Sequence, residues 1–315
     1  MPRPVLIDTD AGVDDALALM LAFRSPELSV KAVTTVAGNV GVRHCTRNVL
    51  AILNLLQVPE RPEVAEGSYK PMRRRLFSAP EVHGKDGLGD VRASLTKVAG
   101  RDLFHHDAVD TIIRASQKYG KKLTIIAIGP LTNLALALAE NPRAMREAGR
   151  IVSMGGAFRV PGNTGPVAEF NYFVDPEAAH TLLNSGLPIT IIPLDVTEQL
   201  AVLRRELEYR AHARPSLVAK TVLRFTRRYM LYHLKTEGFN GGYLHDPLAV
   251  AVAIDPSFVE TRRAHVDVEC SGTFTRGMTV ADFRRRPGRK ENSVKVALKV
   301  DRERFFRLFH GRLWR

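Results

Sequence analysis

The chain has 315 residues, of which 45% are hydrophobic, and it carries a formal net charge of +13. This length and hydrophobic content predict one large α/β domain over residues 1–315, and no apolar run reaches the roughly 18 residues of a membrane span. Cys45 and Cys270 lie far apart and outside any metal-binding spacing, which argues against a disulfide framework and favours the reducing cytoplasm.

Strand-like and helix-like runs alternate through the first two thirds of the chain. Short apolar or β-branched runs predict buried strands, and apolar residues at helical spacing predict the helices between them. The predicted strands are Val5–Ile7, Val30–Val36, Leu123–Ile128, Ile151–Met154 and Pro188–Ile192. The predicted helices are Asp14–Ser25, Arg43–Leu56, a segment from the turn at Gly129–Asn133 through Ala139, and Pro176–Asn184.

The remaining segments complete the predicted fold. The stretch from Pro59 to His106 is rich in Pro, Gly and Arg, and its turn-dense part, Val82–Gly89, predicts a surface loop. Ser216–Leu234 predicts a long helix and Asp301–Leu308 a closing helix. A late antiparallel strand group is predicted at Val266–Glu269, Gly277–Val280 and Val294–Val300. The class is therefore α/β, with a mostly parallel central sheet, helices on both faces and a Rossmann-like core.

Polar residues gather where the predicted strands end. Four aspartates, Asp8, Asp10, Asp14 and Asp15, fall within eight residues after the first strand. Later strand ends and the late helix contribute Asn39, Asn133, Met154, Asn163, Glu169, Asn171, His245 and Asp246. Ligands of open α/β sheets bind at these carboxyl ends. Crowded carboxylates raise one another's pKa unless a cation offsets them, and Ca²⁺ accepts many carboxylate ligands, so we predict a site for this ion.

Each of these residues also has a structural interpretation. Acids in the first turn of a helix favour its macrodipole, which accounts for Asp14 and Asp15. Asp246 precedes a proline and an apolar helix, which is the pattern of an N-cap residue. His245 beside it is then a surface histidine, and His83, in a glycine-rich segment, is interpreted as solvent-exposed.

The positive charge raises a second hypothesis, a protein that binds nucleic acid. Its basic clusters match no helix-turn-helix or zinc-finger spacing and lack the interleaved aromatic residues of a single-strand platform. They are scattered along the chain, at Arg73–Arg75, Arg204–Arg205, Arg224–Arg228 and Arg284–Lys290. A solvated basic surface is the better interpretation, and no specific nucleic acid is expected.

The block from Asp8 to Ala16, DTDAGVDDA, resembles the signature of the inosine-uridine preferring nucleoside hydrolase family. A phosphatase strand end of the form Asp-x-Asp-x-Thr is the nearest alternative, but Gly12 stands where its threonine is needed. The similarity continues, in family order, through Thr35–Asn39, His83–Gly89, Ile128–Asn133, Met154–Gly156, Glu169–Asn171, Asp175–Ala178, Leu244–Pro247 and Arg276–Val280.

The resemblance implies Ca²⁺-dependent hydrolysis of ribonucleosides of the inosine and uridine type to ribose and free nucleobase. It implies that the ion is held by Asp10, Asp15, Asp246 and the carbonyl of Ile128, and that Asp10 takes the proton of the attacking water. The bond to the nucleobase breaks first, through a transition state with oxocarbenium character. Asp8 is implied to orient the ligands from behind.

The resemblance also implies how the substrate is held. The residues implied to bind it are Asp14, Asn39, His83, Met154, Asn163, Glu169, Asn171 and Asp246. His245 matches the residue that gives the leaving nucleobase its proton, and His83 contacts that nucleobase. The preference for one nucleobase over another is expected to depend on Tyr229, Tyr232 and His233. Tyr243 is expected to narrow the mouth of the pocket.

The family resemblance further suggests a homotetramer or a homodimer. Two alternatives stay open at this point. One is a hydrolase of a related ribosyl substrate, such as nicotinate riboside. The other is a basic, nucleic-acid-binding protein that has kept the fold without the activity.

Overall fold

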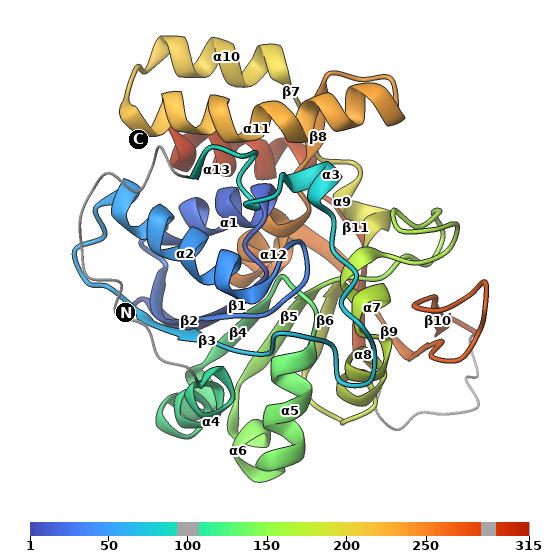
Figure 1. Ribbon diagram of the computed structural model, residues 1–315. Helices are drawn as coiled ribbons and strands as arrows, with labels where there is room; N and C mark the ends of the chain where they lie inside the picture. Colours follow the sequence, from blue (N-terminus) through green and yellow to red (C-terminus); the bar gives the residue numbers. More distant parts are fainter. Residues whose placement is uncertain (93–106, 285–293, 315) are drawn as a thin grey trace.

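Nine strands form one large sheet in the computed structural model, which describes residues 1–92, 107–284 and 294–314. They are β1 (Arg3–Thr9), β2 (Leu28–Thr35), β3 (Glu63–Glu66), β4 (Thr124–Ala127), β5 (Arg150–Met154), β6 (Ile189–Ile192), β9 (Val259–Val268), β10 (Thr279–Asp282) and β11 (Val294–Val300). Their order across the sheet is β10-β9-β11-β6-β5-β4-β1-β2-β3 (Figure 1). All neighbours from β3 to β11 pair in parallel, and β9 and β10 close this edge in antiparallel pairing.

Helices cover both faces of this sheet (Figure 1). One face carries α1 (Val13–Phe23), α2 (Val42–Leu56), α11 (Leu217–Thr236), α12 (His245–Ile254) and α13 (Arg302–Leu313). The other carries α4 (Ala108–Tyr119), α5 (Thr132–Glu140), α6 (Pro142–Glu147) and α8 (Pro176–Leu183). Each set buries its own hydrophobic core against the sheet. No helix among the described residues has the length and apolar character needed to cross a membrane.

Shorter elements connect these layers. They are α3 (Pro80–His83), α7 (Phe170–Val174), α9 (Leu194–Thr197), α10 (Arg204–Ala213), the 3₁₀ turns η2 (Gly120–Lys122) and η3 (Pro256–Phe258), and the antiparallel pair β7 (Ala201–Leu203) and β8 (Gly241–Tyr243). Figure 1 shows α10 lying outside α11, as a second layer over that face.

The central strands are apolar because both of their faces are covered. Val5, Leu6 and Ile7 of β1 are fully buried, as are Ile125 and Ile126 of β4. Such continuous apolar runs are typical of parallel strands between two helical layers. The helix α1 is likewise buried along ten of its eleven residues, since α2 and α12 enclose it against the sheet. The turn between β1 and α1 is therefore held firmly at the centre of the molecule.

The predicted α/β class, with a mostly parallel sheet and helices on both faces, is confirmed. The late strand group is antiparallel as predicted, but it joins the large sheet because β11 pairs in parallel with β6. Its strand β9 begins at Val259, earlier than predicted. The sequence interpretation contained no counterpart of β3, α4, α10 or the pair β7 and β8.

The loop predicted at Val82–Gly89 is confirmed as a run of turns after α3, with Lys85 exposed, but its placement at the surface is wrong for half of its residues. His83 ends the short helix α3 and is only 7% exposed, and Leu88 is fully buried. Gly87 has a φ of +83°, and a side chain there would meet the Asn48 amide at 2.6 Å. The segment packs inward because its glycines permit this close approach. The later part of the predicted loop region, residues 93–106, lies outside the described residues, as do residues 285–290 of the predicted basic clusters.

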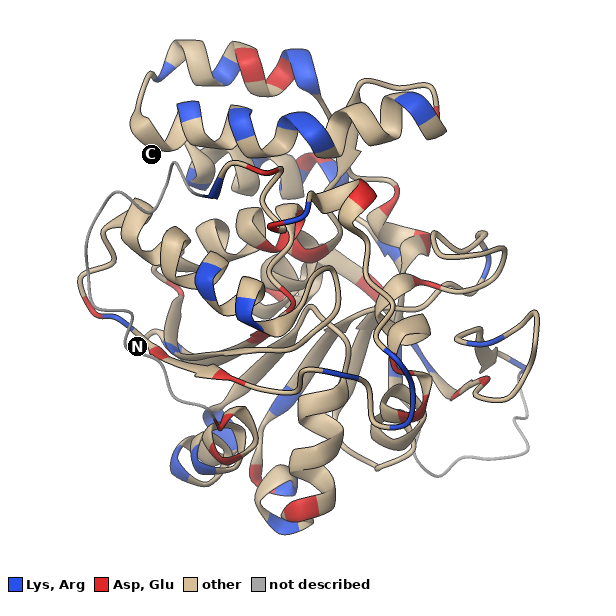
Figure 2. Cartoon of the chain, viewed as in Figure 1, with Lys and Arg blue, Asp and Glu red and all other residues tan. Residues whose placement is uncertain are grey.

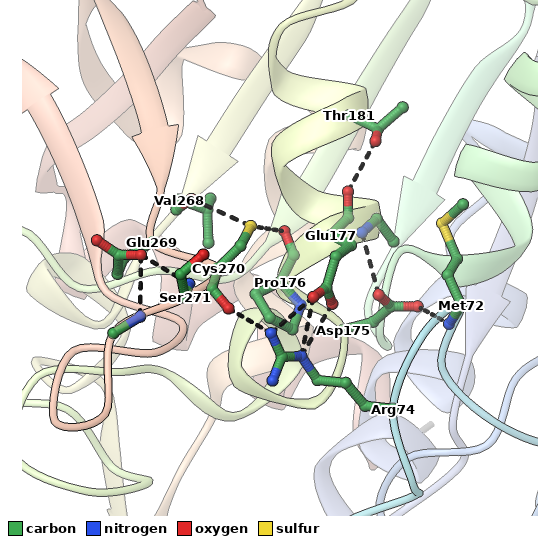
Figure 3. Close-up of polar contacts among 12 residues, drawn as sticks. Met72, Arg74, Asp175, Pro176, Glu177, Thr181, Val268, Glu269, Cys270 and Ser271 are labelled. Atoms are coloured by element: carbon green, nitrogen blue, oxygen red, sulfur yellow. Dashed lines mark hydrogen bonds and ion pairs between the residues drawn. The ribbon is translucent and has the colours of Figure 1, made fainter.

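The segment that leads into α3 is tied to α8 by Arg74 (Figure 3). The Arg74 guanidinium donates to both oxygens of Glu177, with Nη2 to Oε1 at 2.6 Å, and also to the carbonyl of Cys270. The backbone N–H of Met72 donates to Asp175 at 2.8 Å. Bidentate arginine pairs fix geometry as well as charge. Arg74 therefore belongs to the support of this segment rather than to a free basic surface.

Candidate active site

The strand order places a switch point between β1 and β4, because the chain runs outward from β1 to β2 and β3 on one side and to β4, β5 and β6 on the other. Open α/β sheets bind ligands outside the carboxyl ends of the strands at this point. A cavity of about 570 Å³ lies there, lined by residues that follow β1, β2, β4 and β5 together with α11 and α12. This volume is typical of small-molecule sites.

A group of buried carboxylates forms the floor of this cavity. Oxygen atoms of Asp14, Asp15 and Asp246 lie within 4.8 Å of one another. Asp10 joins them through contact with the Asp15 carboxyl. Asp10 Oδ2 accepts the backbone N–H of Asn39 at 2.7 Å, whereas its Oδ1 is buried without a hydrogen-bond partner among the described residues. The structure thus brings together acids that are 236 positions apart in sequence, from 10 to 246.

This arrangement is electrostatically unfavourable without a cation. Burial and the charge of Asp15 raise the pKa of Asp14 to about 8, and burial together with the neighbouring aspartates raises the pKa values of Asp10 and Asp246 well above their usual range. Burial is the first cause in each case, because it penalises the charged form. An orphaned buried oxygen beside three further carboxylates fits a hard divalent cation with oxygen ligands.

The β1–α1 turn positions the acids by local hydrogen bonds. The Thr9 hydroxyl donates to Asp15 Oδ1 at 2.5 Å, and the backbone N–H of Gly12 donates to Asp15 Oδ2 at 2.8 Å. Asp15 therefore closes the first turn of α1 and faces the cavity floor with the same carboxylate. The interpretation of Asp246 as an N-cap is wrong, since Leu244 occupies that position in α12 and makes no side-chain cap. The Asp246 side chain instead meets Asp14 and Asp15.

Asp8 is separate from this group. Its Oδ1 accepts hydrogen bonds from Thr34 at 2.6 Å and from Asn133 at 2.8 Å, and its Oδ2 is buried with no partner in the described part of the chain. Burial raises the pKa of Asp8 to about 7. Asn133 also accepts the backbone N–H of Ser68 at 2.9 Å, so Asp8 helps to hold the segment after β3 against the sheet. Asp8 is therefore not among the residues that line the cavity, and its side chain is bound to β2 and α5.

One wall of the cavity consists of amide and carboxylate side chains. Asn39 Nδ2 donates to Asp15 Oδ2 at 3.1 Å, and Asn171 Nδ2 lies 3.4 Å from the Ile128 carbonyl and 3.3 Å from that of Met154. The side-chain amide of Asn171 therefore contacts the backbone carbonyls of both Ile128 and Met154, beside the acidic group. Ile128 lines the cavity because it is the first residue after β4.

The loop before α7 supplies the opposite end of this wall. Glu169 caps α7 and accepts backbone N–H groups from Gly156, Asn171 and Tyr172, at 3.0, 2.8 and 3.1 Å. Burial raises its pKa to about 7 despite these bonds. Asn163 also lines the cavity, and its Oδ1 accepts the backbone N–H of Phe170 at 2.9 Å. Both side chains thus hold the loop before α7 in place, and both also line the cavity.

Two buried histidines stand at the other end of the cavity. The backbone N–H of Val13, at the start of α1, donates to His83 Nδ1 at 3.1 Å, so a neutral His83 carries its proton on Nε2. His245 Nδ1 lies 2.7 Å from the Thr197 hydroxyl. Burial lowers the pKa of each imidazole to about 3. The interpretation of both as exposed surface histidines is wrong, since both are buried and hydrogen-bonded, and the lowered pKa values favour the neutral imidazole.

The same end holds an aromatic wall that α11 and β8 provide. Tyr229, Tyr232, His233 and Tyr243 all line the cavity. The Tyr243 hydroxyl donates to Glu237 Oε2 at 2.7 Å, and the ring lies 5.4 Å from that of His245. Tyr243 therefore stands at the cavity as predicted, held by a carboxylate at the end of α11.

Three residues near the histidines were absent from the sequence interpretation. Glu198 and Glu237 line the cavity, and Thr197 bonds the His245 ring. Thr197 and Glu198 follow β6, so the rule that located the other strand-end residues applies to them as well. Glu237 lies four residues after His233 on α11 and accepts a hydrogen bond at 2.8 Å from its Nδ1. That spacing is the signal from which the pair was predictable.

A doubly wound sheet with buried carboxylates at its switch point, beneath a cavity with neutral imidazoles, defines the class of the nucleoside hydrolases. The family model described as inosine-uridine preferring nucleoside hydrolase matches residues 5–307. The chain belongs to this family and is a ribonucleoside hydrolase, an enzyme that cleaves N-glycosyl bonds.

Relatives with different base preferences show comparable similarity. The chain is 41% identical to the pyrimidine-specific ribonucleoside hydrolase RihA of Klebsiella pneumoniae, over 99% of both chains. A plant nucleoside hydrolase, the PpNRh1 enzyme, superposes with a TM-score of 0.91 at 36% identity, covering 100% of this chain and 99% of that one. A purine-preferring ribonucleoside hydrolase from Gardnerella vaginalis has a TM-score of 0.90 at 36% identity, covering 99% and 98%.

Proposed function

We propose that this protein is a Ca²⁺-dependent hydrolase that releases ribose from pyrimidine ribonucleosides, with inosine as a further substrate. The pyrimidine preference follows the RihA relative, which is 41% identical to the chain. The observation that carries the proposal is the buried carboxylate group of Asp14, Asp15 and Asp246, with the Asp10 carboxylate beside Asp15 and its Oδ1 without a partner among the described residues. The test is an assay of free ribose from uridine, cytidine and inosine with Ca²⁺ present. Absence of ribose from all three refutes it.

The ligands proposed for the ion are Asp10, Asp15, Asp246 and the carbonyl of Ile128. Among these four ligands, only Asp10 has a buried side-chain oxygen, Oδ1, without a hydrogen-bond partner among the described residues. Asp14 lies in the same tight carboxylate group as Asp15 and Asp246. The sequence interpretation assigned it to the sugar. We therefore propose that its carboxylate borders both the ion and the ribose. A bound Ca²⁺ supplies Lewis acidity to a water molecule and to the ribose hydroxyls.

The proposed roles of the side chains are proton transfer from the attacking water and binding of the ribose. Asp10 accepts a proton from the water that attacks C1′, because its orphaned oxygen has no other hydrogen bond to give up. The residues proposed to hold the 2′ and 3′ hydroxyls are Asp14, Asn39 and Asp246. Those proposed at the 5′ side are Asn163, Glu169 and Asn171, with Met154 packed beneath the ring. These contacts stabilise the transition state more than the bound substrate, because positive charge develops on the ribose as the bond breaks.

The two imidazoles are proposed to assist departure of the nucleobase. His83 carries its proton on Nε2, since Nδ1 already accepts the Val13 N–H. His245 is oriented in the same sense when the Thr197 hydroxyl donates to its Nδ1, which leaves Nε2–H free to donate to the nucleobase. A neutral imidazole N–H is an effective donor to a developing negative charge. We propose His245 as the group that gives the nucleobase its proton and His83 as a second donor.

His245→Ala is expected to lower kcat on uridine and inosine by about 10²-fold and to have far less effect on p-nitrophenyl riboside, because the nitrophenolate leaves without a proton. Steady-state rates on the three substrates measure this difference. The matched variant Thr197→Val, which leaves the imidazole in place but removes its partner, is expected to show a smaller loss of the same pattern. Equal losses on all three substrates remove His245 from this role.

Gly38→Ala is expected to lower kcat by about 10²-fold, because a misplacement of about 1 Å in a reacting group has this effect. A Cβ at position 38 would lie 2.1 Å from Asp10 Oδ2. Gly41→Ala is the matched control on the same loop, since a Cβ there meets no atom within 4 Å. Comparable activity of the two variants, both folded by circular dichroism, contradicts the placement of Asp10 at the reacting water.

The basic charge of the chain does not support a nucleic-acid site. Figure 2 shows Lys and Arg spread over several helices and loops rather than gathered in one stripe. Members of the predicted clusters are bound locally: Arg204 donates to Glu208 at 2.6 Å, and Arg228 donates to Asp90 at 2.8 Å. Assembly as a homotetramer or homodimer and residence in the cytoplasm stay predictions, which size-exclusion chromatography and cell fractionation measure.

A further inference from the structure

The antiparallel edge of the sheet has no role in the proposed hydrolysis. Its strand β10 and the turn before it carry the motif Arg276–Val280, which belongs to the family resemblance. No residue of this motif lines the cavity, and β9, β11 and β6 separate β10 from β5 in the sheet. The hairpin of β9 and β10 nevertheless lies beside α7, the short helix that Glu169 caps (Figure 1).

Thr279, the first residue of β10, binds the turn that follows β5. Its hydroxyl accepts the backbone N–H of Ala157 at 3.0 Å and donates to the carbonyl of the same residue at 2.6 Å. Both residues are buried, with Thr279 3% exposed and Ala157 5% exposed. One side chain thus satisfies both backbone groups of Ala157 and fixes the two peptide planes that flank it.

The residue before Ala157 connects this turn to the cavity. Gly156 has a φ of +83°, a conformation that favours glycine, and its carbonyl accepts the backbone N–H of Leu194 at 2.9 Å. The backbone N–H of Gly156 donates to Glu169 Oε2 at 3.0 Å. A continuous path therefore leads from Thr279 through the turn to the Glu169 side chain, which lines the cavity.

The hairpin of β9 and β10 also contacts the loop before α7 and α7 itself. Met278 forms an antiparallel bridge with Ala168, which lies in that loop. The Arg276 guanidinium lies 3.8 Å from the centroid of the Phe173 ring in α7, which is the distance of a cation–π contact. The edge of the sheet is therefore docked on this loop and helix rather than left free at this end.

We propose that Thr279 is a positioning residue for the 5′ side of the ribose. It acts through the turn after β5, which holds Glu169 in the orientation that binds the 5′ hydroxyl group of the substrate. This inference rests on the proposed ribohydrolase activity and on the placement of Glu169 at the 5′ side. Thr279 lies outside the cavity lining, so its effect reaches the substrate only through Ala157, Gly156 and Glu169.

Loss of the Thr279 hydroxyl leaves both backbone groups of Ala157 buried without a partner. Unsatisfied buried groups are costly, so the turn is expected to shift until water or another polar group reaches them. Such a shift moves the Gly156 N–H away from Glu169 and weakens the hold on the 5′ hydroxyl group. Binding energy from this remote part of the substrate serves the chemical step as well, so kcat is expected to fall together with affinity.

The experiment combines enzymes that differ by one hydroxyl group with substrates that differ by one hydroxyl group. Wild type is compared with Thr279→Val, which has nearly the same shape. Thr279→Ser is compared with Thr279→Ala, a second pair with smaller side chains that serves if the valine variant does not fold. The substrates are uridine and 5′-deoxyuridine. Thr261→Val, at an exposed position of the neighbouring strand β9, is the matched control. Values of kcat, KM and the thermal midpoint are measured.

Wild type is expected to prefer uridine over 5′-deoxyuridine by about tenfold or more in kcat/KM, because a site built for a hydroxyl group rejects the analogue that lacks it. Removal of the Thr279 hydroxyl, in either pair, is expected to lower kcat/KM on uridine by about tenfold and on 5′-deoxyuridine by no more than about twofold. Thr279→Ser and Thr261→Val are expected to keep the wild-type preference.

A purely structural role for Thr279 lowers the rates on both substrates alike. Equal losses on the two substrates, an unchanged preference in the hydroxyl-free variants, or failure of both of these variants to fold overturns the inference while uridine hydrolysis by wild type stands. A wild type that hydrolyses uridine without preference over 5′-deoxyuridine also overturns it, since Glu169 then does not serve the 5′ hydroxyl group. A wild type that hydrolyses neither substrate overturns the proposed function and the inference together.

Discussion

Asp10→Asn is expected to lower kcat on uridine by on the order of 10⁴-fold, the upper end of what a general base contributes. The asparagine has nearly the shape of the aspartate, but it cannot accept the proton of the attacking water or carry charge towards the ion. Asp10 Oδ1 is buried and unpartnered, so no other described group stands ready to replace it. Single-turnover and steady-state assays with saturating Ca²⁺ separate this chemical defect from weaker metal binding.

Asp8→Asn is the matched control for this variant. Asp8 is equally buried and lies two residues earlier on β1, but it bonds Thr34 and Asn133 rather than the acidic group. A loss of about 10- to 100-fold is expected for a residue that orients others. Metal-free Asp10→Asn is expected to melt no lower than metal-free wild type, because the substitution removes one of several like charges. Activity of Asp10→Asn equal to that of Asp8→Asn contradicts the assignment of Asp10 as the base.

Removal of Ca²⁺ with EGTA is expected to abolish ribose release and to lower the thermal midpoint by about 5 °C when the ion had been present at 100 times its Kd. Both effects follow from the floor of the cavity, where the carboxylates of Asp14, Asp15 and Asp246 lie within 4.8 Å of one another. Readdition of Ca²⁺ is expected to restore activity and midpoint, and Mg²⁺ to restore them less well, since it prefers fewer carboxylates and more water.

The size of this thermal effect depends on pH. The pKa of Asp14 is raised to about 8 and that of Asp8 to about 7 in the metal-free chain, above their unfolded values. Groups with raised carboxyl pKa values bind protons more tightly when folded, so their contribution to stability is present at low pH and is lost as pH rises towards 8. The EGTA-induced drop is therefore expected to grow between pH 5.5 and pH 8. Full activity in EGTA, with an unchanged midpoint, contradicts a metal site.

The regular part of the fold was predictable because its elements are strongly patterned. The strands β1, β4 and β5 contain apolar runs, and α1 and α2, which follow β1 and β2, have helical spacing. Elements without such a pattern were missed: β3 has four residues at the sheet edge with a glutamate at each end, and α10 is mostly charged and buries only Leu207 and Ala211. The helix α4 is amphipathic and capped by Asp107, so its signal was present and overlooked.

The candidate site was predictable where residues stand next to a strand end. Asp10 directly follows β1, Asn39 lies four residues after β2, and Met154 is the last residue of β5, so the topology alone brings these positions to one edge of the sheet. The family resemblance placed His83 and His245 in the site, but local composition did not predict their burial, which depends on glycines that let one segment approach another and on a threonine 48 residues away. Local composition suggests exposure for such residues, and only tertiary packing reverses it.

The hydrogen bond from the Val13 N–H to His83 has a consequence for how the enzyme assembles. The donor is the first amide of the helix that carries Asp14 and Asp15, and the acceptor is a ring 70 residues further along the chain. Loosening of the first turn of that helix therefore also removes the hydrogen-bond donor that orients the His83 ring. The placement of the buried acids and the orientation of this imidazole are consequently coupled through a single backbone amide.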